Sequence, residues 1–415
     1  AAKIKEVRIV GAKVFKESEL VGLMDLTTSG WLTWYTKNDR YSRAKLNADL
    51  DTLRAYYQNR GYLEFNIENA QVTISPDKQT ISLTIQVKEG QPYTVTGVRL
   101  EGDYLGRDDE FKQLIGIRAG EPYRAAAVTA TTKAFTDRFG TFGYAFARVE
   151  ARTEIDRSNG QVAVVLVADP QRRVYVRRID VAGNTRTRDE VVRREFRQLE
   201  SSWYDGERIK ASRERVDRLG YFKDVEVNEN EVAGTADQVD LTVNVTERPT
   251  GNLQLGVSFS SADRLALSAS IKQENVFGSG NYLGLEVNTS KTGRSLVFST
   301  VDPYFTVDGI SRGIDLYYRT SRPFNSLGDQ YQIANPGGAI RFGVPFSEFD
   351  TVFFGIGIEQ TNIGASTGIP AQYFNYRQLY GAKSTSLPLT LGWARDQRDS
   401  ALSPTAGKYQ RVNVE

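Results

Sequence analysis

The sequence contains no cysteine and no histidine. Their absence excludes disulfide bonds, thiolate nucleophiles, thiolate or imidazole metal sites, and the Ser-His and Cys-His arrangements of hydrolases. No apolar run approaches the roughly 20 residues that a membrane-spanning helix needs. We therefore predict no catalytic, cofactor-binding or metal-binding residues, and any crossing of a membrane would have to use β-strands.

Charged residues become sparse toward the carboxyl end. Asp, Glu, Lys and Arg make up 77 of the first 250 residues but only 27 of the 165 that follow, while glycine rises from 17 to 19. Each part has one more base than acid, so the net charge does not indicate a nucleic-acid partner. The change near Pro249 predicts two parts that lie in different environments.

The first part contains one pattern three times. Each copy opens with a short alternating strand that ends in glycine, and then has two helical stretches, a Gly-Tyr pair and an alternating hairpin. The strand-ending glycines are Gly11, Gly102 and Gly183, and the pairs are Gly61-Tyr62, Gly143-Tyr144 and Gly220-Tyr221. This order predicts three tandem α+β domains (βααββ), with boundaries at 1–90, 91–172 and 173–249.

The helices of the third copy show the pattern clearly. We expect Asp205 to cap a helix that ends at a left-handed Gly220 and buries Ile209, Ser212, Val216 and Leu219. The spacing of Thr187 and Glu190 predicts a capping box on the shorter helix, which would bury Val191 or Val192, Phe196 and Leu199. For Gly61, Gly143 and Gly220, a helix cap is a sufficient explanation.

Residues 250–415 alternate in strand fashion, in about nine runs that end abruptly at Glu415. A soluble sandwich also alternates, but the runs approach the length of membrane-spanning strands. Aromatic residues near the strand ends would form an interfacial girdle: Tyr282, Tyr304, Phe305, Tyr317, Tyr318, Tyr331, Tyr373, Phe374 and Tyr376. Short turns at 261–263 and 291–293 would alternate with long ones at 323–329 and 362–384. We predict an incomplete antiparallel transmembrane β-barrel.

Several segments carry a resemblance that spans nearly the whole chain. They are Leu53 to Tyr57 with Arg60 to Tyr62, Arg138 to Ala145, Tyr175 to Ile179, Arg193 to Gln198, Val245 to Gly251 and Asp302 to Gly309. With these segments, the chain resembles the BamA family of outer-membrane assembly factors, whose soluble modules are called POTRA domains. The resemblance implies a fragment that holds the last three of five POTRA domains and the first half of a sixteen-strand barrel.

The resemblance also implies a function and a location. The protein would insert unfolded β-barrel client proteins into the bacterial outer membrane without a nucleotide or cofactor, with its repeats in the periplasm. Its partners would be the outer-membrane lipoproteins of the assembly complex, the clients and the lipid bilayer. Two alternatives stay open: a TamA-like translocation factor or two-partner secretion pore, and a passive porin with a scaffold arm.

Exposed strand edges are the candidate client sites, because an unpaired edge binds another strand through its backbone. In each repeat we expect the second strand to begin at the tyrosine of the Gly-Tyr pair. The candidate residues are Tyr62, Leu63, Phe65, Tyr144, Phe146, Tyr221 and Phe222. By the resemblance, the first barrel strand forms one side of a lateral seam: Asn252, Leu253, Gln254, Leu255, Gly256, Val257 and Ser258. The alternative for the repeats is an ordinary solvated edge.

Two charged clusters complete the prediction. The resemblance places a lipoprotein against the membrane-proximal repeat, where Arg193, Arg194, Glu195 and Arg197 are candidates for the contact. The alternative is a solvated helix face. Near the carboxyl end, Asp396 and Asp399 lie close to Arg395 and Arg398 in the sequence. We expect ion pairs there rather than an acid/base pair.

Overall fold

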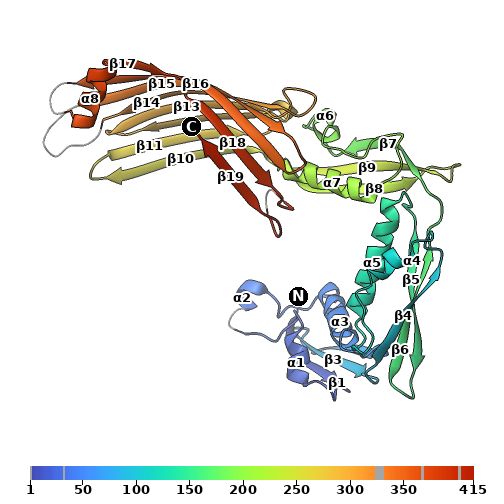
Figure 1. Ribbon diagram of the computed structural model, residues 1–415. Helices are drawn as coiled ribbons and strands as arrows, with labels where there is room; N and C mark the ends of the chain where they lie inside the picture. The colour runs from blue at the N-terminus through green and yellow to red at the C-terminus, as the bar shows by residue number, and fades with distance from the viewer. Residues whose placement is uncertain (1, 31–32, 323–330, 366–368, 401–402) are drawn as a thin grey trace. The chain divides into compact units, whose positions relative to one another are not determined.

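The computed structural model describes residues 2–30, 33–322, 331–365, 369–400 and 403–415. The chain divides into two compact units. One comprises residues 1–175 with 203–207, and the other comprises residues 176–202 with 208–415. Figure 1 labels the helices and strands of both.

The first repeat forms a three-stranded sheet with helices on it. Its elements are β1 (Lys3–Val10), α1 (Glu17–Gly22), α2 (Thr33–Thr36), α3 (Arg43–Gln58), β2 (Asn66–Ile74) and β3 (Thr80–Lys88). The strand order is β1-β3-β2, with β1 parallel and β2 antiparallel to the central β3. The predicted βααββ order is therefore present, with the short helix α2 in addition.

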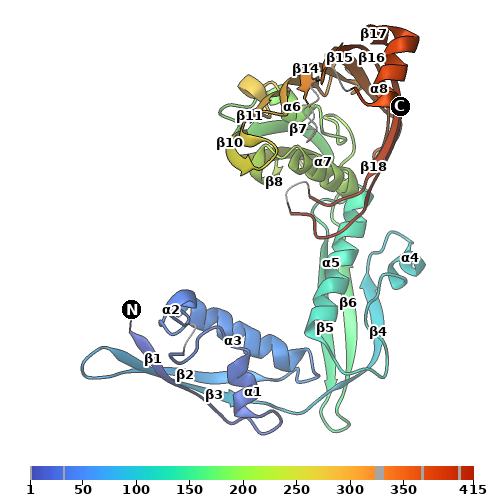
Figure 2. The same ribbon diagram turned by 90° about the vertical axis from the view of Figure 1, so that its left-hand side faces the viewer.

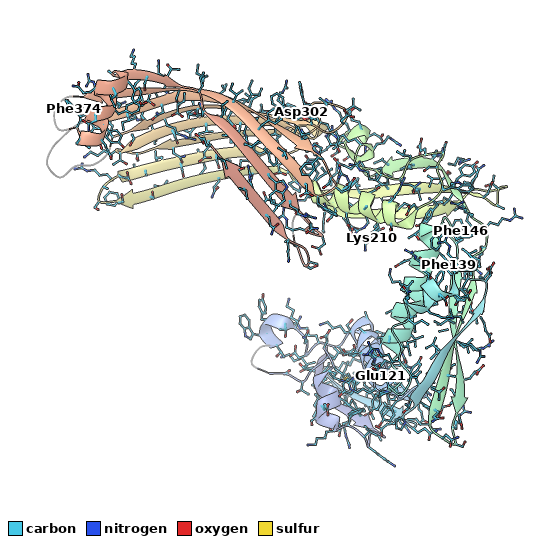
Figure 3. The ribbon with its side chains drawn as sticks, viewed as in Figure 1. Glu121, Phe139, Phe146, Lys210, Asp302 and Phe374 are labelled. Atoms are coloured by element: carbon cyan, nitrogen blue, oxygen red, sulfur yellow. The ribbon has the colours of Figure 1, made fainter. Side chains whose placement is uncertain are left out.

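The second repeat has the same topology. It contains β4 (Thr94–Gly102), α4 (Asp108–Lys112), α5 (Ala125–Thr141), β5 (Arg148–Asp156) and β6 (Gln161–Asp169), in the sheet order β4-β6-β5. Phe111, Phe135 and Phe139 are fully buried and pack against Tyr104 to form an aromatic core. Figure 3 labels Phe139 on α5.

The first two repeats are joined through the Gly-Tyr turn of the first. The Tyr93 N–H donates to the Gly61 carbonyl at 2.8 Å, and Leu63 packs against the core of the second repeat. Arg157 pairs with Glu64 at 2.6 Å. Gly61 has φ +96°, so the predicted left-handed cap is present, and its carbonyl also forms part of the joint.

The third repeat contains β7 (Tyr175–Ala182), α6 (Asp189–Arg193), α7 (Gly206–Arg218), β8 (Phe222–Glu231) and β9 (Gln238–Glu247), in the order β7-β9-β8. As predicted, α7 buries Ile209, Ser212 and Val216. Two details of the prediction were wrong. Leu199 is 61% exposed. The capping box does not form, because the Thr187 N–H donates to Glu247 and its hydroxyl accepts from Asn275.

The rest of the chain forms one antiparallel sheet. Its strands are β10 (Gly251–Ser260), β11 (Arg264–Gln273), β12 (Tyr282–Thr289), β13 (Gly293–Asp302), β14 (Ser311–Ser321), β15 (Tyr331–Pro345), β16 (Asp350–Ala365), β17 (Lys383–Ser386), β18 (Leu389–Asp396) and β19 (Tyr409–Val414). The sheet thus has ten strands, and the short β17, which pairs with the end of β16, is the strand that the prediction missed. Figure 2 shows the sheet as an open arc.

One face of this sheet is apolar and exposed. Leu255, Val257 and Phe259 are 72%, 73% and 80% exposed, and the register places them opposite Ala269, Leu267 and Leu265. A sandwich would bury such a face against a second sheet, so the exposure favours a partial barrel. Among the residues described, no helix has the length and apolar character needed to cross a membrane.

The predicted alternation of short and long turns was wrong. In an antiparallel sheet every second connection lies at the same end. The short turns at 261–263 and 291–293 follow β10 and β12, and the long connection within 362–384 follows β16, so all three lie at one end of the sheet rather than at opposite ends. Residues 323–329 lie outside the described residues. The connections after β11, β13, β15 and β18 lie at the other end, near the third repeat. Figure 3 labels Asp302 at that end and Phe374, on helix α8 (Ala371–Tyr380), at the opposite one.

Candidate functional site

The second strand of each repeat lies at a sheet edge, with one strand neighbour. The expected starting points were wrong for two of these strands, because β2 begins at Asn66 and β5 at Arg148, whereas β8 begins at Phe222, one residue after the expected Tyr221. In the first two repeats a turn follows the Gly-Tyr pair before the strand starts. The edges themselves lie at residues 66–74, 148–156 and 222–231, and their role in client binding stays a prediction.

The predicted edge residues are mostly core residues. Tyr62 and Phe65 are buried in the first repeat, where Phe65 stacks on Tyr57. Tyr144 packs against the core of the second repeat, and Phe146, labelled in Figure 3, is half-buried just before β5. Tyr221 and Phe222 are buried in the third. These side chains hold the edge strands in place, so a partner strand would have to pair with the backbone beyond them.

The first strand of the large sheet is also an edge. β10 pairs with β11 from Gly251, opposite Gln273, to Ser260, opposite Arg264. It has no second strand neighbour among the described residues. All of the predicted seam residues from Asn252 to Ser258 therefore lie on one edge strand, and all are exposed except Gly256, which is half-buried.

Charged residues connect the third repeat to the large sheet. Arg215 on α7 pairs with Glu195 at 2.9 Å and with Glu348 at 2.8 Å, and Arg197 pairs with the other oxygen of Glu348 at 2.9 Å. Glu348 belongs to the turn between β15 and β16. Arg194 lies over the ring of Tyr304, with 4.3 Å between the guanidinium carbon and the ring centroid. We call Arg194, Glu195, Arg197, Arg215, Tyr304 and Glu348 the rim network.

Electrostatics favour this arrangement. Burial alone would raise the pKa of Glu348, but the guanidinium groups of Arg197 and Arg215 hold that pKa below its ordinary value. Burial opposes the charge of Arg215, and the facing carboxylates of Glu195 and Glu348 outweigh it and raise its pKa. The carboxylate of Glu348 is therefore charged at neutral pH.

The rim network bears on the predicted lipoprotein contact. Glu195 is only 4% exposed, so it is not a solvated surface carboxylate in this structure. Arg194 and Arg197 also face the sheet, whereas Arg193 pairs with Asp189 at 2.8 Å and donates to the Ile179 carbonyl. The contact with a lipoprotein stays a prediction. Tyr304 belongs to the rim network and is half-buried there, which differs from the girdle position expected for it.

A turn of the large sheet docks on the third repeat. Within the connection between β11 and β12, the Asn275 amide donates to the Thr187 hydroxyl at 2.8 Å, and the Gly278 carbonyl accepts the Arg188 N–H at 3.0 Å. Burial raises the pKa of Tyr221 to about 12, so its hydroxyl stays protonated and donates to the Gly280 carbonyl at 3.0 Å. We call residues 274–281 the docked turn. The docked turn was not predicted from the sequence, although its two glycines, Gly278 and Gly280, indicate a place where another part of the backbone can approach closely.

In the first and third repeats, a glutamate at the end of the last strand or directly after it accepts several hydrogen bonds. Glu89 accepts the N–H groups of Lys13 and Val14 and the hydroxyl of Tyr57. Glu247 accepts the Thr185 hydroxyl and the N–H groups of Arg186 and Thr187. These carboxylates fix the loop after the first strand of their repeats, a role that was not predicted from the sequence.

Glu247 should make the third repeat acid-sensitive. Burial alone would raise its pKa, but the hydrogen bonds from Thr185, Thr187 and Arg186 lower it below the ordinary 4.5. Stability from a lowered pKa is present above about pH 4.5 and is lost as the pH falls further. In urea unfolding of the three repeats as a soluble fragment, we expect Glu247→Gln to cost about 1 kcal/mol at pH 7.

The difference in unfolding free energy between Glu247→Gln and the native fragment should shrink as the pH falls from 5 to 3. At low pH, protonation removes the charge of Glu247 in the native fragment as well. Glu226→Gln, at an exposed position on β8, serves as the control and should change stability little at either pH. A deficit that stayed constant across this range would show that the charge of Glu247 contributes nothing.

Among the described residues, the ion pairs expected near the carboxyl end form at Asp396, Arg395 and Arg398 but not at Asp399. Asp396 pairs with Arg398 at 2.8 Å, and Arg395 approaches Asp350 at 3.9 Å. Asp399 accepts hydrogen bonds from the Thr405 hydroxyl and from the N–H groups of Thr405 and Ala406. Together these hydrogen bonds lower the pKa of Asp399 to about 2.

Comparison with protein families gives three matches along the repeats and one along the sheet. The POTRA family model, described as a surface antigen variable number repeat, matches residues 2–90, 93–171 and 174–248. The Omp85 superfamily domain matches residues 275–415. The chain is 35% identical to the outer membrane protein assembly factor BamA of Neisseria meningitidis serogroup B over 426 residues, which cover 100% of this chain and 54% of the relative. The chain belongs to the BamA family.

Further relatives agree with this assignment. BamA of Nitratidesulfovibrio vulgaris is 29% identical over 97% of this chain and 50% of its own length. The chain spans about half the length of these curated relatives. The BamA family consists of non-enzymatic assembly factors.

Two solved structures resemble the fold. BamA from Haemophilus ducreyi lacking POTRA domains 1–3 matches with a TM-score of 0.61 and 27% identity, covering 77% of this chain and 63% of that one. POTRA domains 3–5 of BamA from Haemophilus influenzae match with a TM-score of 0.55 and 29% identity, covering 59% of this chain and 96% of that one. The fold is thus three POTRA domains followed by part of an antiparallel barrel sheet.

Proposed function

We propose that this chain is the part of an outer-membrane assembly factor that receives unfolded β-barrel clients and passes them into the bilayer. Its sheet would lie in the bacterial outer membrane, and its three POTRA domains in the periplasm, with boundaries at 1–90, 91–172 and 173–249. They would correspond to the last three POTRA domains of the complete protein. The names and functions of the BamA relatives support this proposal.

The observation that carries the proposal is the outer edge of β10, which no described strand pairs, beside an exposed apolar face. An edge strand in lipid leaves backbone N–H and C=O groups without partners, and each such group costs several kcal/mol in hydrocarbon (about 2–7 kcal/mol). A client strand that pairs with β10 would satisfy both edges at once. Because backbone pairing reads no side chains, one edge can serve clients of many sequences.

The edges of the repeats would act earlier, in the periplasm. β2, β5 and β8 each have one strand neighbour, and their buried aromatic side chains keep them extended. We propose that these edges bind extended client segments or partner lipoproteins by β-augmentation. No step of this transfer breaks or forms a covalent bond, so the proposal needs no catalytic residue, nucleotide or cofactor.

Depletion of the protein separates this function from the alternatives. An assembly factor serves many clients, so its depletion should lower the outer-membrane content of many unrelated barrels. Depletion of a TamA-like factor or a two-partner secretion pore should leave one or a few client proteins untransported. Depletion of a passive porin should change only the conductance of the membrane. We expect broad loss of barrels, measured by quantitative proteomics of outer membranes. Loss confined to one secreted client would contradict the proposal.

A further inference from the structure

Beside the docked turn lies a cavity of about 540 Å³. Its walls come from the third repeat, from the first residue of β10 and from the docked turn. The lining residues used below are Arg186, Tyr221, Arg248, Gly251, Gln273 and Phe277. The cavity therefore lies where the periplasmic repeat meets the edge strand.

The lining of the cavity has one more cation than anion, because it holds two arginines and the single carboxylate of Glu247. Among the described residues, the guanidinium groups of Arg186 and Arg248 have no hydrogen bond or ion pair. The one carboxylate in the lining, Glu247, is occupied by the Thr185 hydroxyl and two backbone N–H groups. Two cations thus face a space large enough for a ligand.

The second cavity at this junction shows the contrast. It measures about 720 Å³ and is lined by the rim network. There Arg197 and Arg215 are paired with Glu348, and Arg215 also with Glu195. Two arginines of this second cavity are therefore paired with carboxylates, whereas Arg186 and Arg248 of the first cavity have no such pair among the described residues.

An aromatic side chain lies at the edge of the unpaired cavity. Phe277 is 93% exposed and has φ +50°, a left-handed conformation that is strained for a non-glycine residue. The docked turn holds it there through Asn275 and Gly278. Leu253 and Ile271, which face each other at this end of β10 and β11, are 66% and 51% exposed. Cationic and apolar groups therefore lie side by side.

We propose that this cavity binds the phosphate-bearing headgroup of an anionic lipid. Arg186 and Arg248 contact the phosphate, and Phe277 contacts the glycerol and upper acyl chain. Phosphate oxygens are strong acceptors for guanidinium groups, and an aromatic ring favours the interfacial depth at which a headgroup lies. The bound lipid would fill the gap between the third repeat and β10. This inference rests on the proposed membrane location of the sheet but not on client insertion.

Binding of a short-chain lipid to the complete protein in neutral detergent tests the site. Dioctanoyl phosphatidylglycerol is titrated and counted by native mass spectrometry, with dioctanoyl phosphatidylcholine and inorganic phosphate as the comparison ligands. We expect one saturable phosphatidylglycerol site that Arg186→Ala/Arg248→Ala weakens about tenfold or more. Arg186→Lys/Arg248→Lys should keep most of the binding. Arg188→Ala removes an exposed arginine of the same loop outside the lining, and it should change nothing.

Three results would overturn the proposal. They are equal binding of phosphatidylglycerol and phosphatidylcholine, unchanged binding in the double alanine variant, or inorganic phosphate that competes as strongly as the lipid. Phe277→Ala should weaken the lipid but leave the weak binding of inorganic phosphate unchanged. The heat-dependent gel shift of folded barrels confirms that each variant is folded. The titration contains no client, so its failure would leave the proposed assembly function untouched.

Discussion

Replacing Glu195 with glutamine should open the contact between the third POTRA domain and the barrel sheet. The glutamine cannot neutralise Arg215, whose side chain is only 20% exposed. Breaking a buried pair costs about 3–5 kcal/mol when the remaining charge is left uncompensated, and the loss here should be smaller because Arg215 keeps Glu348 as a partner. Hydrogen exchange of the complete protein should therefore quicken in α7 and in the turn that carries Glu348.

Asp189→Asn is the matched control for this prediction. It removes the carboxylate from an arginine pair on the same domain, but Asp189 is 51% exposed, and exposed pairs contribute about 0–1 kcal/mol. Equal exchange in Glu195→Gln and in the native protein would show that the rim network does not hold the domain.

The second large effect is expected at Gly183, the residue that ends β7. Gly183 has φ +87°, and a Cβ built on it would lie 2.0 Å from the Val245 carbonyl oxygen. Gly183→Ala therefore combines a strained backbone conformation with a backbone clash that no side-chain rotation relieves. We expect it to destabilise the three-domain fragment by about 2–4 kcal/mol in urea unfolding.

Gly234→Ala separates the two contributions. Gly234 also has a positive φ, +80°, but a Cβ there would meet nothing within 4 Å. It should cost only about 1 kcal/mol, from the backbone conformation alone. If both variants lost the same stability, the close approach to Val245 would have no energetic role. Gly11 and Gly102 have the same geometry against Val87 and Ala168, so the same result is expected in the other two domains.

This shared geometry explains why the repeats could be predicted from the sequence. The glycine that ends the first strand, the periodic helix and the left-handed Gly-Tyr turn are local features, each visible within a few residues. The alternation of β10 to β16 is local in the same sense. The starting points of β2 and β5 were misplaced, because the turn after Gly61 and Gly143 has no alternating pattern to mark its end.

The contacts between segments that lie far apart in the sequence could not be predicted from local features. Arg197 and Glu348 lie 151 residues apart, and each has an ordinary surface composition around it. The charge run at residues 193–197 looked like a solvated helix face or a partner site, and only the fold shows that it faces the barrel. The docked turn could not be predicted for the same reason, because the hydrogen bond from Asn275 to Thr187 joins two segments that only the fold brings together.

The central claim is that β10 pairs with client strands, and disulfide cross-linking measures it directly. These 415 residues contain no cysteine, so Asn252→Cys, Gln254→Cys and Ser258→Cys each supply the one thiol of this part of the protein. Each variant of the complete protein is combined with a client that carries one cysteine in its terminal strand. The account predicts efficient cross-links in one fixed register along β10, and none from Ser268→Cys on β11, whose two neighbours are present. Cross-links without register, or clients that insert fully without any β10 cross-link, would contradict it.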